Sequence, residues 1–252
     1  MTDSLSPDLP KPRRLEFKRV LSFLLHPRQE TARLVEEQKA SWLTPMLVSS
    51  LTLIMYILVS GFLKARAAAM GEIALPADWQ WWTPEMQNNY MQAVQATQGP
   101  AFLYIIPLVL GLAKLWLGWA VAGGLLHLVS TLLGGRGTMV SALNVVGWAR
   151  LVFAVRDLLR VAFMLAAGRP IASAGLSGFS TAPFLAQVLA GLDIFLVWYA
   201  ALLAIGLGAA DSLPRGKAIA GSLIVLVIIL LATAGLGALS ANLSGMMTNR
   251  PF

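Results

Sequence analysis

The stretch PMLVSSLTLIMYILVSGFL, residues Pro45 to Leu63, contains nineteen residues without a charge. A helix of that length, at about 1.5 Å per residue, crosses the roughly 30 Å of hydrocarbon in a bilayer. We therefore predict a transmembrane helix here, and with it an integral membrane protein.

The composition of the whole chain agrees with this class. Of its 252 residues, 57% are hydrophobic and 12% are charged, and the mean hydropathy is +0.71. In a soluble domain about a quarter of the residues are charged. Cysteine is absent, which excludes disulfides, iron–sulfur clusters and thiol nucleophiles. His26 and His127 lack the spacing of metal ligands, so we predict no metal site and no cofactor.

Four further apolar runs follow the first span. They predict an all-α fold, an integral membrane bundle of five transmembrane helices in residues 44–243. The expected spans cover residues of about 45–63, 101–126, 142–166, 184–209 and 218–242.

The segments outside the spans are polar or amphipathic. Residues 1–14 predict a disordered cytoplasmic tail, because three prolines block helix formation. Residues 15–43 predict a short amphipathic or helical segment, either on the cytoplasmic membrane surface or packed on the protein itself. In the first external loop, Thr83 and Pro84 predict the start of a short amphipathic helix, which lies on the outer face or forms a lid. Residues 244–252 are expected to form a short external tail.

The basic residues predict the orientation. The formal net charge is +7, and eight of the nineteen Lys and Arg residues precede the first span. With five crossings and a cytoplasmic N-terminus, the inner segments carry eleven Lys or Arg residues and the outer segments four. The positive-inside rule therefore favours a multi-pass protein of the cell membrane (plasma or inner), with a cytoplasmic N-terminus and an external C-terminus. The basic surface fits an anionic bilayer, so we expect no nucleic-acid partner.

The third apolar run differs from the others in its charge. Its stretch RLVFAVRDLLRVAFML, Arg150 to Leu165, contains four charged residues. Each charge at the bilayer centre costs about 2.5 to 3.5 kcal/mol on an insertion scale. On a helix these residues share one polar face. Together with charged residues of the neighbouring runs they form a candidate cluster: Lys114, Arg150, Arg156, Asp157, Arg160 and Asp193.

Two kinds of pairing are expected within this cluster. Asp157 can pair with Arg160, three residues further on, and Asp193 can meet Arg150 or Arg156 across the bundle. With four cations and two acids, two positive charges remain uncompensated if all six residues are buried. That imbalance requires water, a snorkelling exit or an anion.

Three interpretations of the cluster remain open. In the first, the segment breaks near residues 147–150, its arginines snorkel to the headgroups, and its charge pairs are structural. In the second, the excess positive charge binds an anionic lipid headgroup or a small anionic solute. In the third, the polar face docks another membrane subunit.

The sequence GGRGT follows the second run. Gly134, Gly135, Arg136 and Gly137 predict a tight cytoplasmic turn, because glycine tolerates positive φ. The turn lacks the lysine spacing of a Walker motif and follows a membrane helix instead of a strand. No set of serine, histidine and aspartate is identifiable as a catalytic triad. We predict that the protein is not an enzyme.

Three stretches resemble the Yip1-domain family of polytopic membrane proteins. They are HPRQETARLVEEQKASWLTP before the first span, LLGGRGTMVSALNVVGWA after the second, and LVWYAALLAIGLGAADSLPRGKAIAGSLIVLVII at the last two. The resemblance implies a five-helix bundle with a cytoplasmic N-terminus. Eukaryotic members are associated with vesicle trafficking, but this chain lacks the DLYGP motif of that branch and resembles the prokaryotic branch instead.

These observations together predict a non-enzymatic membrane protein that acts as a membrane-organising, scaffold or accessory component. The alternative is a protein that handles anionic lipid or transports a small solute through the intramembrane basic cluster. The expected partners are the lipid bilayer, anionic lipid, and another membrane subunit or a second copy of the chain.

Overall fold

The computed structural model describes residues 15–37, 39–72, 75–76, 78–171, 175–180 and 182–248. This part of the chain is helical and contains no strand, which confirms the expected all-α class. The expected disordered tail, residues 1–14, lies outside the described residues, as do residues 249–252 of the expected external tail.

The helices follow one another with short connections. In chain order they are α1 (Phe17–Leu25), α2 (Pro27–Glu37), α3 (Leu43–Ala69), η1 (Trp79–Trp81), α4 (Pro84–Thr97), η2 (Ala101–Ile105), α5 (Ile106–Leu132), α6 (Met139–Ala149), α7 (Leu151–Ala167), η3 (Ser177–Phe179), α8 (Pro183–Gly191), α9 (Ile194–Ala210) and α10 (Arg215–Thr248).

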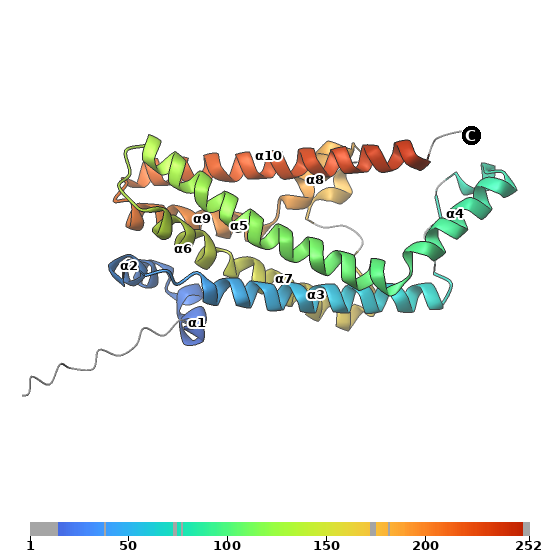
Figure 1. Ribbon diagram of the computed structural model, residues 1–252, viewed down its shortest axis with the longest axis horizontal. Helices are drawn as coiled ribbons and strands as arrows, with labels where there is room; N and C mark the ends of the chain where they lie inside the picture. Colours follow the sequence, from blue (N-terminus) through green and yellow to red (C-terminus); the bar gives the residue numbers. More distant parts are fainter. Residues whose placement is uncertain are drawn as a thin grey trace, which may run out of the picture.

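The long helices lie along one common direction (Figure 1). α3 and α7 pack together on one side, α9 packs against α10 on the other, and α5 crosses between the two sides. α1 and α2 lie at the end where α5 turns into α6, which we call the α2 end. α4 projects at the opposite end, which we call the α4 end.

Three helical segments are individually long and apolar enough to cross a membrane. They are α3, the continuous segment Ala101–Leu132, and Arg215–Ser240 of α10. Helices α8 and α9 satisfy the same criterion as a pair, Phe184–Gly191 with Ile194–Ala210, but they bend by 64° at the break. The described residues thus contain three candidate spans, or four if the bent pair is one span, where the sequence predicts five.

The two remaining expected spans are interrupted, which explains the lower count. The expected span at 142–166 divides into α6 and α7 at Arg150, where the Phe153 N–H donates to the Arg150 carbonyl in a tight three-residue turn. The expected span at 184–209 divides into α8 and α9, because Leu192 and Asp193 have extended backbone angles. A run of apolar residues reports how well a segment tolerates lipid, and it does not report whether the helix is continuous.

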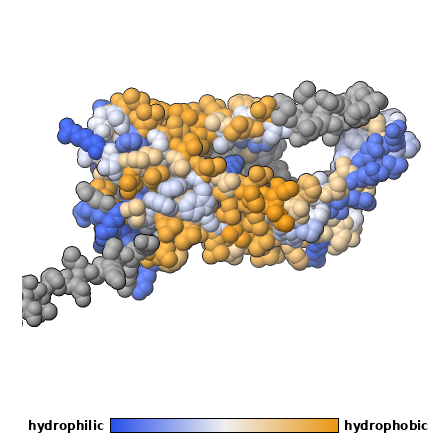
Figure 2. Space-filling view, viewed as in Figure 1, coloured by the Kyte–Doolittle hydropathy of each residue, from blue (hydrophilic) through white to orange (hydrophobic). Residues whose placement is uncertain are grey.

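Hydropathy follows the long axis of the molecule. Apolar side chains cover the middle of the visible face, and hydrophilic residues gather at the two ends (Figure 2). Two aromatic clusters are present: Trp42, directly before α3, lies tilted against Trp119 with ring centroids 4.5 Å apart, and Trp79 and Trp82, directly before α4, have ring centroids 5.6 Å apart. Tryptophans concentrate at the two membrane–water interfaces of membrane proteins, so these clusters fit the ends of a span.

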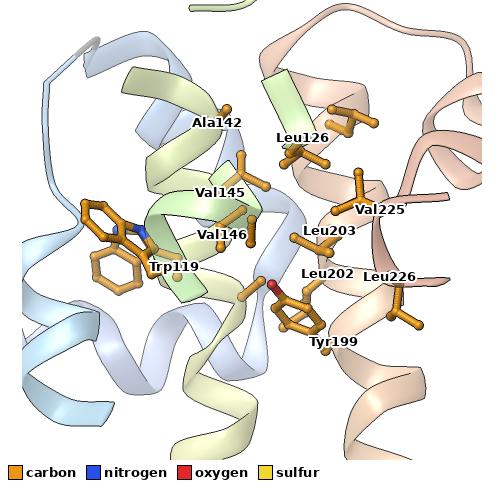
Figure 3. Packing of buried hydrophobic residues seen from close by; sticks show 14 of the residues in the cluster. Trp119, Leu126, Ala142, Val145, Val146, Tyr199, Leu202, Leu203, Val225 and Leu226 are labelled. Carbon is orange, nitrogen blue, oxygen red and sulfur yellow. The ribbon is translucent and has the colours of Figure 1, made fainter. Parts of the chain in front are cut away.

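The core lies between α5, α6, α9 and α10 (Figure 3). Val146 and Leu203 are fully buried there, with Leu126 beside them. Gly206 of α9 lies so close to Val145 of α6 that a methyl group on Gly206 would overlap the valine side chain. This close approach brings α6 and α9 together and fixes the position of α7, which continues from α6.

Candidate functional site

The charged side chains of α7 meet the start of α9 inside the bundle. Arg156 Nη1 lies 3.3 Å from Asp193 Oδ2, and Arg160 Nη2 lies 3.9 Å from the same oxygen. Arg156 Nε lies 3.7 Å from Asp157 Oδ1. Asp193 therefore meets Arg156 across the bundle, as expected, whereas Asp157, among the ion pairs of the described residues, pairs with Arg156 in place of the expected Arg160. Asp193 pairs with both arginines.

Asp193 also caps a helix at the break between α8 and α9. Its side chain accepts a hydrogen bond of 2.9 Å from the Leu196 N–H, so it is the N-cap of α9. A helix start leaves backbone N–H groups without an internal partner, and a carboxylate satisfies one of them and favours the positive end of the helix dipole. One carboxylate therefore begins α9 and joins it to α7.

The guanidinium groups of Arg156 and Arg160 each lie over an aromatic ring. The Arg156 guanidinium lies 4.6 Å from the centre of the Phe153 ring, and that of Arg160 lies 6.0 Å from the centre of the Tyr56 ring. A cation over an aromatic face gains about 0.5 to 2 kcal/mol, more when it is removed from water. These rings help to stabilise positive charge within an apolar environment.

Arg150 is the cation that the acids leave unmatched. None of the ion pairs among the described residues includes it, and its Nε is buried without a hydrogen-bond partner. Its guanidinium lies beside Gly118 of α5, with Nη1 3.8 Å from the position that a Cβ atom on residue 118 would take. The charges of Arg150, Arg156 and Arg160 exceed those of Asp157 and Asp193 by one, so the group is net positive.

Lys114 stands apart from the other candidate residues. It is exposed on α5, and no ion pair of the described residues includes it. Without Lys114 the excess positive charge is one, compared with the two expected from the sequence. A helical run alone does not tell which side of α5 faces the bundle, and the apolar residues of α5 surround the lysine on every side.

The glycine turn packs on the connection between α9 and α10. Gly134 has a φ of +89°, a conformation that glycine adopts without strain. Asp211 fills the space beside Gly137, where any side chain would overlap it, and the Arg136 N–H donates to the Asp211 carbonyl over 3.4 Å. Lys217 Nζ donates to the Leu133 carbonyl at the end of α5. The turn is therefore a packing element that connects three helix ends.

A polar clamp that the sequence did not reveal holds the start of α3 to α6. Asn144 Oδ1 accepts from the Ser41 N–H at 2.9 Å, and its Nδ2 donates to the Lys39 carbonyl at 2.7 Å. Trp148 Nε1 donates to Ser41 Oγ at 3.0 Å. The partners are about a hundred residues apart in the chain, so no local spacing indicates them. The clamp brings together the first two of the stretches that resemble the family.

A second unexpected group joins α1 to α2. Arg19 is 10% exposed and pairs with Glu16, Glu30 and Glu37 at 2.7 to 2.8 Å. Burial disfavours its charge, but the hydrogen bonds to the three glutamates outweigh this effect and raise the pKa of Arg19.

The pKa values of two of these glutamates, Glu30 and Glu37, shift in the opposite direction, downward. Burial acts to raise the pKa of Glu30, but hydrogen bonds from Arg19 and Ser22 outweigh it, so the net effect lowers that pKa. The hydrogen bond from Arg19 lowers the pKa of Glu37. The raised pKa of Arg19 and the lowered pKa values of Glu30 and Glu37 therefore favour the charged forms of these three side chains at neutral pH.

The part of the chain that the structure describes contains no group of three His, Cys, Asp or Glu residues that could hold a metal ion. Apart from Arg150, the polar groups described above inside the bundle form ion pairs, helix caps and backbone clamps. The fold and these sites define a multi-pass, all-helical membrane protein.

Comparison with known families gives the family. A model of the Yip1 domain matches residues 21–236, which is most of the chain. The chain belongs to the Yip1 family. Searches of characterised proteins and of solved structures gave no significant match.

Proposed function

We propose that this protein is a non-enzymatic scaffold or accessory component that organises the membrane or a larger membrane complex. The observation that carries the proposal is the position of Asp193. It pairs with Arg156 and Arg160 of α7 and caps α9, so the acid best placed for chemistry is used to hold the bundle together. Two ion pairs and a helix cap give this carboxylate a structural role, which supports a scaffold over a proton relay.

Five crossings are part of this proposal. α7 has seventeen residues, about 25 Å of helix at 1.5 Å per residue, and the preceding turns of α6 extend it toward the α2 end. In this proposal α6 and α7 together make one crossing, and α3, α5, the bent pair α8 and α9, and α10 make the other four. The number of crossings is therefore odd. The excess of Lys and Arg before the first span supports a cytoplasmic N-terminus in the cell membrane. Absence of the DLYGP motif supports the prokaryotic branch of the family.

The topology is tested by one accessibility tag, placed at the N-terminus in one variant and at the C-terminus in another. The proposal expects the two tags on opposite sides of the membrane. Both tags on one side would contradict five crossings.

The role is tested by native mass spectrometry of the protein released in mild detergent. A scaffold or accessory component is expected as a stoichiometric complex with another membrane protein or with itself. A uniformly monomeric protein without a partner would contradict the role.

A second candidate function, binding of an anionic lipid headgroup or a small anionic solute, is favoured by Arg150. Its Nε is buried without a partner, and the charge group around it is net positive. The same mass spectra test this function, with retained phosphatidylglycerol as the readout. Binding at Arg150 requires Arg150→Gln to lose the lipid while Lys114→Gln, on the exposed side of α5, keeps it. Equal retention by both variants would contradict it.

A further inference from the structure

Helix α1 turns its arginine inward and a row of apolar side chains outward. Arg19 is enclosed by the three glutamates, whereas Phe17, Leu21 and Leu25 are 56%, 66% and 65% exposed. These three residues recur every fourth position, so they form one row on the helix. A helix that faces water carries the opposite arrangement, with its apolar residues turned toward the protein.

The row cannot turn away by rotation of the helix. Arg19 is anchored to Glu30 and Glu37 of α2, and Ser22 donates to Glu30 at 2.7 Å. On the inner side Phe23 is 3% exposed and packs on Trp148, with ring centroids 5.4 Å apart. The orientation of the outer row is therefore fixed by contacts on the inner side of the helix.

Helix α1 lies beside the start of the first span, α3. The Glu16 N–H donates to Thr44 Oγ1 at 2.9 Å, and Thr44 belongs to the first turn of α3. α1 lies crosswise to α3 at the α2 end (Figure 1). A helix at the depth where a span begins, lying across the direction of that span, lies along the plane of the membrane interface.

We propose that α1 is an interfacial helix whose row Phe17, Leu21 and Leu25 inserts into the boundary between headgroups and acyl chains. The partner of this surface is the lipid leaflet at the α2 end. Lys18 is exposed next to the row, and Arg28 is exposed at the start of α2. Their charges favour anionic headgroups, and amphipathic interfacial helices combine these two features.

The absence of cysteine allows a direct test, because one introduced cysteine carries one nitroxide label. The full-length Leu21→Cys variant is labelled and reconstituted in vesicles of phosphatidylcholine and phosphatidylglycerol. Collisions of the label with oxygen, which partitions into lipid, are compared with collisions with a water-soluble nickel chelate. Leu51→Cys, on the exposed side of α3, is the lipid reference, and Gln29→Cys, exposed on α2, is the water reference.

The label at Leu21 is expected to have an oxygen-to-nickel collision ratio several-fold above that at Gln29 and below that at Leu51. A ratio equal to that at Gln29 would overturn the proposal. Protection from both reagents would also overturn it, because a protein surface would then cover the row. Leu25→Cys repeats the measurement at a second position of the row if the first variant does not fold.

The contribution of charge is measured with Lys18→Gln in the same labelled background. In vesicles with phosphatidylglycerol this variant is expected to lower the collision ratio at Leu21. In vesicles of phosphatidylcholine alone it is expected to change the ratio little. An equal effect in both lipids would overturn the part of the proposal that assigns Lys18 to anionic headgroups.

Discussion

Arg156 Nη1 lies 3.3 Å from Asp193 Oδ2, and this contact joins the middle of α7 to the N-cap of α9, at the break that follows α8. Two interrupted helices therefore meet through opposite charges. The pair stabilises a helix break inside the bundle, where unpaired backbone groups are costly because lipid offers no hydrogen bonds. This use of the charges explains why a membrane segment tolerates them.

The clamp made by Asn144 gives the first prediction. Asn144→Leu removes hydrogen bonds to the Ser41 N–H and the Lys39 carbonyl, and it leaves these backbone groups without their partner. Loss of a buried partner costs about 1 to 3 kcal/mol, so we expect a clear decrease in apparent Tm in detergent. Gln95→Leu, at an exposed position of α4, is the matched control and is expected to change the apparent Tm little. Equal Tm values for the two variants would contradict the clamp.

The close approach of α6 and α9 gives the second prediction. Gly206→Ala introduces a methyl group that overlaps Val145, and overpacking of this kind costs about 1 to 3 kcal/mol. Val145→Ala removes the overlapping atoms. We expect the apparent Tm of the double variant to exceed that of Gly206→Ala. A double variant that is less stable than Gly206→Ala would show that the two side chains do not compete for one space.

The ion-pair group of α1 and α2 gives the third prediction, a dependence on pH. The pKa values of Glu30 and Glu37 in the folded protein lie below the ordinary value of 4.5. Lowered carboxyl pKa values stabilise the fold above the unfolded pKa, and this stabilisation is lost as the pH falls through the folded pKa. We therefore expect the stability of the group to be complete at neutral pH and to decline below pH 4.5.

This pH dependence is measured as the difference in apparent Tm between the unmodified protein and the variant Glu30→Gln with Glu37→Gln. The difference is expected to be constant near neutral pH and to shrink in acid. Glu36→Gln, exposed and outside the group, is the control and is expected to give a small difference at every pH. A Tm difference that grows on acidification would contradict the lowered pKa values of Glu30 and Glu37.

The sequence predicts the helical membrane class and the family, because both follow from apolar runs and from the order of short motifs. It also identifies Arg156, Asp157, Arg160 and Asp193, since charges in an apolar segment conflict with their surroundings. Local spacing did not predict the partners. Asp157 pairs with Arg156 next to it, and Arg160, three residues further on, lies near Asp193 of another helix instead.

The break before α9 had a local signal in the sequence. An aspartate directly before an apolar run is a typical N-cap, and Asp193 precedes Ile194 in this way. The length of the surrounding apolar run outweighed this signal in the prediction of a single span. The Asn144 clamp and the contacts of Arg19 with Glu30 and Glu37 had no comparable signal, because they join residues that only the folded chain brings together.

The central claim is that the intramembrane charges hold the bundle together, and a double-mutant cycle of Arg156 and Asp193 tests it most directly. Asp193→Asn is expected to cost about 2 to 3 kcal/mol, below the 3 to 5 of a fully buried pair, because both side chains keep some exposure. Arg156→Gln is also expected to destabilise, and the double variant is expected to lose less stability than the sum of the single losses. Additive losses, or an Asp193→Asn variant as stable as the unmodified protein, would contradict the claim.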